Sequence, residues 1–173
     1  MPFSLLPDMI YPAITDIAPQ QLQSLGIKWL LLDFDNTIVP YTTDEPTDAV
    51  VEWIERMRQA GIHLCIVSNS RRMRVRTFAE KYGLALVTGA KKPFQRGIRK
   101  AEEYFDFTKA ETALVGDQIY TDVLGANCGG LTSVLVTSIN NHTIWLKLRH
   151  LAELPFIAMG RRKIRRERSE KVR

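Results

Sequence analysis

Four short polar segments of this chain carry residues that can act together on a phosphate ester. They follow apolar, strand-like runs or turns, and they occupy residues 33–37, 68–69, 92–93 and 116–122. Aspartate, serine and lysine are common where loops begin, so no segment is informative alone. Taken together in this order, they predict a magnesium-dependent phosphoryl-transfer site.

The first segment supplies two carboxylates. A phosphate ester resists attack by an anion, so a site must supply positive charge and hold the reacting oxygens in line. Asp33 ends a long apolar run and can act as the nucleophile while also binding Mg²⁺, which gives an aspartyl-phosphate intermediate. Asp35 points the same way and can act as general acid and then as base, with its backbone carbonyl as a further metal ligand. The alternative for this segment alone is a solvated turn capped by Asn36 and Thr37.

The second and third segments supply groups for a phosphoryl oxygen. Ser68 offers a hydroxyl, and the backbone N–H groups that follow, beginning at Asn69, can bind the same oxygen, although this is also ordinary turn composition. Lys92 can neutralise the transferring group and orient Asp33. Its place beside Pro93 favours it over Lys91, but the sequence leaves the choice between the two lysines open.

The last segment completes the metal site. Asp117 follows an apolar run and is the third carboxylate expected on the metal, with Asp33 and Asp35. Asp122 lies one helical turn further on and is expected to reach the metal through water or another ligand. The alternative for Asp122 is a charge at the start of a helix.

Alternating strands and helices must position these residues. Strands are predicted over 27–34, 62–67, 84–87, 112–115 and 131–136, where apolar residues dominate. Helices are predicted from Pro19 to about residue 25 and over 48–60, 71–82, 93–105, 119–126 and 143–154, with the last one stopping near Pro155. This alternation favours an α/β fold with a mainly parallel sheet and helices on both faces. In such sheets ligands bind beyond the carboxyl ends of the strands.

Length and composition fit one globular domain followed by a basic tail. The chain has 173 residues, 45% of them hydrophobic, and a net charge of +5. Residues 161–173 hold eight Lys or Arg and two Glu, so residues 1–160 are close to neutral. No apolar stretch approaches the ~18 residues of a membrane span, and the start lacks the basic flank of a secretory signal. A cytoplasmic protein is therefore expected.

The tail at 161–173 has three interpretations. It can hold the protein at an anionic membrane surface, it can bind RNA or a ribosome, or it can be a disordered, solubilising end. A cluster of arginines, Arg71, Arg72, Arg74 and Arg76, follows the second polar segment. One of these can reach an anionic substrate, and the others are expected on a solvated helix face.

Over residues 27–137 the sequence resembles the haloacid dehalogenase (HAD) superfamily of phosphatases. The four ordered motifs of that superfamily are matched by Asp33 with Asp35, Ser68, Lys92, and Asp117 with Asp122. The resemblance implies a three-layer α/β/α sandwich, Mg²⁺ and an aspartyl-phosphate route. Within the superfamily the chain is most similar to subclass IIIA phosphatases of the YqeG type, relatives of mitochondrial phosphatidylglycerophosphate phosphatases. That relationship implies phosphatidylglycerophosphate or another phosphorylated metabolite as the substrate.

The spacing also predicts that the site is open. Between residues 37 and 62, and between 92 and 112, there is room for one helix only, so a large cap domain is excluded. An open site suits a large substrate, or a small one enclosed by a second copy of the chain. The main alternative function is a non-catalytic phosphate-recognising or RNA-associated module docked by the tail. A response-regulator receiver is disfavoured, because its acceptor aspartate ends the third strand.

Overall fold

A parallel sheet of six strands forms the centre of the computed structural model, which describes residues 3–71, 73–140 and 144–171. Its strand order is β1-β6-β5-β2-β3-β4, and every neighbouring pair is parallel. The strands are β1 (Met9–Tyr11), β2 (Trp29–Leu32), β3 (His63–Ser68), β4 (Ala85–Thr88), β5 (Thr112–Gly116) and β6 (Thr132–Val136).

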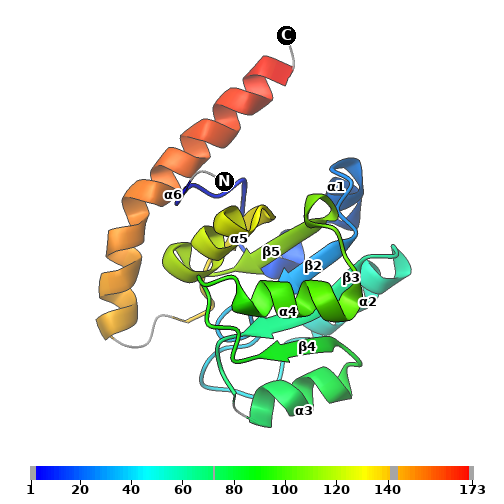
Figure 1. The fold of residues 1–173 in the computed structure, drawn as a ribbon. Coiled ribbons are helices and arrows are strands. Elements are labelled where there is room, and N and C mark those ends of the chain that lie inside the picture. The colour runs from blue at the N-terminus through cyan, green and yellow to red at the C-terminus, as the bar shows by residue number, and fades with distance from the viewer. Residues whose placement is uncertain (1–2, 72, 141–143, 172–173) are drawn as a thin grey trace.

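Helices cover both faces of this sheet, which confirms the predicted α/β sandwich (Figure 1). On one face lie α1 (Pro19–Ser24), α2 (Asp48–Gln59) and α3 (Met73–Lys81), packed with Leu30 and Leu32 in one core. On the other face lie α4 (Arg96–Phe105) and α5 (Leu124–Gly129), packed with Leu31 in a second core. Successive side chains of a strand point to opposite faces. The continuous apolar run in β2 therefore exists because both of its faces are buried.

The short strand β1 was not predicted. It comprises three residues beside prolines and pairs with β6 at the edge of the sheet, where Met9 is opposite Val134. A strand of this length has too little periodicity to be recognised from sequence. The other predicted strands and helices are present, with ends shifted by a few residues except for the last helix, which is much longer than predicted.

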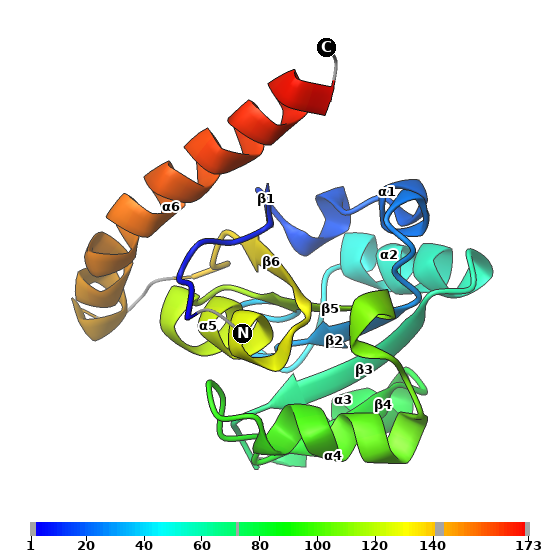
Figure 2. The same cartoon turned by 45° about the horizontal axis from the view of Figure 1, so that its top comes forward.

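Helix α6 (Ile144–Lys171) is longer than predicted. The helix was predicted to stop near Pro155, and a disordered, solubilising end was one of the three interpretations of residues 161–173. Instead α6 continues through Pro155 and includes the described part of the tail. Its C-terminal part extends away from the sheet in both ribbon views (Figures 1 and 2).

Tertiary contacts explain why α6 continues. Phe156 and Ile157, like Leu5 and Ile10, pack against the buried cluster of Ile119, Val123 and Leu135. Two turns further on, the Lys163 ammonium lies 3.0 Å from Oδ1 of Asp8, and Gly160 lies so close to Pro7 that an added Cβ would fall 2.8 Å from the proline ring. Packing of this kind outweighs the local preference of proline to end a helix.

The strand ends carry no separate domain among the described residues. The connection from β2 to β3 contains α2, and the connection from β4 to β5 contains α4 and a short 3-10 turn, η2 (Lys109–Glu111). This confirms the prediction that a large cap is absent. Within the described part of the chain, no helix combines the length and apolar character needed to cross a membrane.

Candidate active site

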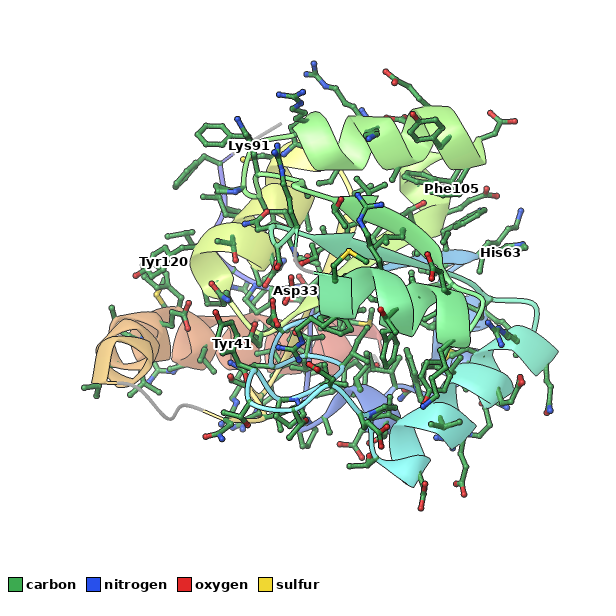
Figure 3. The ribbon with its side chains drawn as sticks, turned by 90° about the horizontal axis from the view of Figure 1, so that it is seen from below. Asp33, Tyr41, His63, Lys91, Phe105 and Tyr120 are labelled. Carbon is green, nitrogen blue, oxygen red and sulfur yellow. The ribbon has the colours of Figure 1, made fainter. Side chains whose placement is uncertain are left out.

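The predicted residues meet at one edge of the sheet. Strand β2 lies between β3 and β5, and the polar segments follow the carboxyl ends of these strands and of β4. The helices after β2 and β3 cover one face, whereas those after β4 and β5 cover the other, so β2 and β5 flank the topological switch point. In Figure 3 the labelled Asp33 lies between Lys91 and Tyr41, which belong to the loops after β4 and β2.

Lys92 is buried between two carboxylates. Its Nζ atom lies 2.6 Å from Oδ1 of Asp33 and 2.8 Å from Oδ1 of Asp122. The side chains of Lys92 and Asp122 are each 1% exposed, and that of Asp33 is 10% exposed. These contacts decide between the two lysines, because Lys91 is exposed and Lys92 is the one that reaches the carboxylates.

Three carboxylates form a cluster with the geometry of a cation site. One oxygen each of Asp33, Asp117 and Asp122 lies within 4.8 Å of the others, and all three residues are buried. One ammonium group, that of Lys92, accompanies them, so two negative charges remain when all three are ionised. A divalent cation balances this charge, and carboxylate oxygens are the ligands that Mg²⁺ prefers. The donor set therefore fits the metal that the sequence predicts.

The cluster differs from the predicted metal set in two respects. Asp122 was expected to reach the metal through water or another ligand, but its carboxylate belongs to the compact group with Asp33 and Asp117. The carboxylate of Asp35 points instead to Arg74, at 3.1 Å from Nη1. The backbone carbonyl of Asp35 remains the predicted contribution of that residue to the metal.

Burial and charge shift the protonation of Asp33 and Lys92 in the metal-free protein. Burial raises the pKa of Asp33 to about 7; Lys92 opposes the shift, and Asp122 and Asp117 add to it. For Lys92, burial acts to lower the pKa, but the carboxylates of Asp122 and Asp33 outweigh it and raise the pKa above its ordinary value. The lysine thus stays cationic, and Asp33 gains a proton readily when no metal neutralises its neighbours.

Asp122 reaches the cluster because of the backbone around it. It lies in η3 (Ile119–Val123), a single π-helical turn after β5, and its Oδ2 accepts the N–H of Gln118 at 3.1 Å. A Cβ on Gly116 would fall 2.2 Å from the carboxyl carbon of Asp122. Only glycine leaves room for this carboxylate at the end of β5. This steric requirement explains why a glycine precedes Asp117.

Asn69 holds the backbone of Lys92. The Lys92 N–H donates to Oδ1 of Asn69 at 2.6 Å, and Nδ2 of Asn69 donates to the Lys92 carbonyl at 3.1 Å. Ser68 is buried at the end of β3, and its hydroxyl oxygen accepts the N–H of Ser70 at 3.1 Å. The Asn69 side chain therefore positions the lysine loop, a role that the sequence analysis did not assign to it.

Arg74 is the site residue that sequence reasoning missed. Four arginines follow the second polar segment, and the sequence offered no means to choose among them. In the structure the Arg74 guanidinium contacts Asp35, Asp44 and the loop after β2. Arg74 differs from the exposed Arg71 and Arg76 in being partly buried, and this difference follows from tertiary packing alone.

A groove runs from the site to α6. It has a volume of about 400 Å³ and lies between the edge strands and α6. Asp117 and Ser138 line it at the site, and Arg161 lines it on α6. A neighbouring hollow of about 430 Å³ shares Arg161 and continues to Arg165. The apolar lining is Ile10, Leu135, Val136, Leu154, Ile157 and Ala158.

Comparison with known proteins agrees with this geometry. The model of the mitochondrial PGP phosphatase family matches residues 1–139. The chain is 34% identical over 134 residues to the "Probable phosphatase YqeG" of Bacillus subtilis, with 78% of each chain covered. It is 27% identical over 119 residues to a glyceraldehyde 3-phosphate phosphatase of Pyrococcus abyssi, which covers 62% of this chain and 49% of that protein.

Solved structures share the fold. The cobalt-bound deoxy-D-mannose-octulosonate 8-phosphate phosphatase of Haemophilus influenzae is similar with a TM-score of 0.55 and 15% identity, covering 75% of this chain and 77% of that one. The related phosphatase of Yersinia pestis has a TM-score of 0.52 at 15% identity, covering 78% and 75%. The chain therefore belongs to the mitochondrial PGP phosphatase family and is a phosphatase of the HAD superfamily.

Proposed function

We propose that this phosphatase is a Mg²⁺-dependent phosphomonoester hydrolase that works through an aspartyl phosphate on Asp33. The observation that carries the proposal is the buried contact between Asp33 and Lys92 inside a cluster with Asp117 and Asp122. A nucleophile, a cation and metal-binding carboxylates are thus present within one small volume.

The residues that would hold the metal are Asp33, Asp117 and Asp122, with the backbone carbonyl of Asp35. When bound, Mg²⁺ supplies positive charge to the phosphoryl oxygens and to the attacking carboxylate. Lys92 adds a second positive charge at the same place, and Ser68 is proposed to bind a phosphoryl oxygen from the end of β3. Asn69 supports this arrangement by holding the backbone of Lys92.

The proposed reaction has two steps. In the first, a carboxylate oxygen of Asp33 attacks phosphorus, the bond from phosphorus to the ester oxygen breaks, and Asp35 gives a proton to that oxygen. In the second, water attacks the phosphorus of the aspartyl phosphate while Asp35 takes a proton from the water. Orthophosphate leaves and the Asp33 carboxylate is restored, so Asp35 is again protonated for the next ester.

For the substrate, we propose phosphatidylglycerophosphate or a similar lipid phosphate. The matched family model supports this class, and so does the largely apolar groove that begins at Asp117 and reaches Arg161. Such a groove can hold the part of the lipid next to the scissile phosphate, and Arg161 can meet a second anionic group. The absence of a cap among the described residues leaves room for a substrate held in a membrane.

For the tail, we propose contact with an anionic membrane surface. Arg161, Arg162, Arg165 and Arg166 are exposed on α6, and each basic residue near such a surface contributes about 1 kcal/mol. Sedimentation with neutral vesicles and with vesicles containing anionic lipid tests this. The full chain should bind the vesicles that contain anionic lipid and should not bind the neutral ones. Deletion of residues 161–173 should abolish this binding. Preferential, salt-sensitive retention of RNA by the tail would favour the RNA-associated alternative instead.

A substrate screen tests the catalytic proposal. Phosphate release is measured from phosphatidylglycerophosphate in mixed micelles, sugar phosphates, nucleotides, phosphopeptides and an aryl phosphate, with Mg²⁺ and with EDTA. Release should require Mg²⁺ and should be fastest from the lipid. The Asp33→Asn variant should fold normally and release no phosphate, and Mg²⁺-dependent activity in that variant would remove Asp33 from the proposed role.

A further inference from the structure

Arg74 on α3 lies beside the proposed acid and base of the reaction. Its side chain is 10% exposed, and its Nη1 atom lies 3.1 Å from Oδ1 of Asp35. Its Nε atom lies 2.9 Å from Oδ1 of Asp44, which belongs to the loop after β2 and is 75% exposed. One guanidinium group therefore joins a residue of the site to the loop beside it.

The same group also binds the backbone of that loop. Nη1 donates to the Tyr41 carbonyl at 2.9 Å, and Nη2 donates to the Pro40 carbonyl at 3.0 Å and to that of Thr43. The guanidinium carbon lies 5.2 Å from the ring centroid of Phe34 and 5.9 Å from that of Tyr41. Phe34 precedes Asp35 in the chain, so this cation–π contact holds the Arg74 guanidinium beside the segment that carries Asp35.

The guanidinium is engaged mainly by the protein itself. Its two Nη atoms donate hydrogen bonds to three backbone carbonyls of the loop after β2, and ion-pair contacts join it to the carboxylates of Asp35 and Asp44. These contacts direct the side chain toward Asp35 and the loop. They favour a role through Asp35 over direct contact with the substrate.

We propose that Arg74 is a positioning residue that holds the Asp35 carboxyl group at the place where the leaving oxygen takes its proton. The inference rests on the proposed function, in which Asp35 is the general acid. Asp35 follows a strand end and is partly exposed, so its side chain needs a partner to keep one rotamer. A planar, five-donor group already fixed to α3 and to the 40–44 loop provides that partner.

The test compares two esters that differ in their need for a proton. An aryl phosphate such as p-nitrophenyl phosphate releases a stable anion, whereas an alkyl phosphate releases an alkoxide that must be protonated as it leaves. For each variant, kcat/KM is measured on both esters, because this ratio reports the step in which the leaving group departs rather than the later hydrolysis of the enzyme ester. The variants are Arg74→Gln and Arg74→Lys, with Arg76→Gln on the exposed face of α3 as the matched control.

We expect Arg74→Gln to lower kcat/KM for the alkyl ester about tenfold or more beyond its effect on the aryl ester, which is part of the about 10²–10⁴-fold that general acid catalysis contributes. Arg74→Lys should show a smaller difference of the same sign, and Arg76→Gln should show none. Asp44→Asn loosens only the loop side of the contact, so it should change both esters equally. An equal loss on both esters in folded Arg74 variants, or a selective loss in Asp44→Asn, would overturn the proposal.

Failure of the proposed function has a different signature. A wild-type protein that releases phosphate from neither ester would contradict the hydrolase proposal itself. If Arg74→Gln does not fold, as judged by its thermal transition, Arg74→Lys carries the comparison. A crystal structure of the folded variant gives an independent measurement, because Asp35 should then leave the position it has beside Arg74.

Discussion

Nζ of Lys92 lies 2.6 Å from Oδ1 of Asp33, and both side chains are almost completely withdrawn from solvent. Charges in such a place are stable only when they neutralise one another. The Lys92 ammonium contacts the carboxylates of both Asp33 and Asp122. Its removal therefore leaves the three buried carboxylates of the cluster without this cation in the metal-free protein. The residue proposed for phosphate binding is thus also a structural counter-charge.

The first prediction concerns this double role. Lys92→Met should reduce the free energy of unfolding of the metal-free protein by about 3–5 kcal/mol and abolish turnover, because it leaves buried carboxylates without a counter-charge. Lys91→Met is the matched control and should change neither quantity measurably, since Lys91 is exposed. Urea denaturation in EDTA and phosphate release in Mg²⁺ measure the two effects. Equal stability of the two variants would show that the lysine is not needed to balance the cluster.

The second prediction is a pH dependence of metal-free stability. The pKa of Asp33 is raised by burial from 3.8 to about 7 in the folded state, so the folded protein holds a proton that the unfolded chain has lost between these values. The stabilisation from this group is complete below pH ~4 and is lost as the pH rises through ~7. Wild-type protein in EDTA should therefore lose stability over this range relative to Asp33→Asn.

The measurement is urea denaturation of both proteins at pH 4.5, 6 and 8, with the difference between them isolating Asp33. At about 1.4 kcal/mol per pKa unit, the change is on the order of a few kcal/mol. Saturating Mg²⁺ should reduce the slope, because the metal binds the ionised carboxylates. A constant difference between the proteins across this pH range would mean that the pKa of Asp33 is not raised.

The placement of the principal residues could be predicted because it depends on local patterns. A run such as Leu30 to Leu32 is apolar on consecutive residues only when both faces of a strand are buried, which identifies a parallel sheet. The polar residue that follows such a run must then lie at the carboxyl edge. This reasoning brought Asp33, Ser68 and Asp117 to one place without any knowledge of their contacts.

The remaining features depend on contacts between distant parts of the chain. The pairing of Arg74 with Asp35 depends on the packing of α3 against the loop after β2, and neighbouring arginines look the same in sequence. The approach of Asp122 depends on a π-helical turn, which is rare and has no sequence signature. Likewise α6 passes Pro155 because Phe156 and Ile157 pack against a buried cluster that includes Ile119, and because Lys163 contacts Asp8.

The third prediction tests the steric link between Gly116 and Asp122. A Cβ at position 116 would meet the Asp122 carboxyl group at 2.2 Å, so Gly116→Ala must displace that carboxylate. We expect lower stability and weaker Mg²⁺ binding, read as a smaller rise in thermal midpoint with added Mg²⁺. An added Cβ at position 116 would also lie 2.5 Å from the Cβ of Asp122, so the matched background is Asp122→Gly, which removes every one of these atoms. In that background, adding Gly116→Ala should cost much less than it does in the wild type. Additive losses across this double-mutant cycle would contradict the steric account.

The fourth prediction concerns the contact that joins α6 to the site. The Glu153 carboxylate is buried, and its Oε1 accepts the N–H of Ile119, the first residue of the turn that carries Asp122, at 3.0 Å. Glu153→Ala leaves this buried N–H without that acceptor, at a cost of about 1–3 kcal/mol. It also loosens the turn, so Mg²⁺ should raise the thermal midpoint by less than in the wild type.

Glu153→Gln separates this effect from a general loss of packing, because its amide oxygen can still accept the Ile119 N–H. It should recover most of the stability and most of the response to Mg²⁺. Tyr120→Phe is a second control, since it removes only the exposed hydrogen bond from the same turn to the Ala152 carbonyl of α6. If Glu153→Ala lost stability but kept the full response to Mg²⁺, α6 would be a support for the fold that has no influence on the carboxylate cluster.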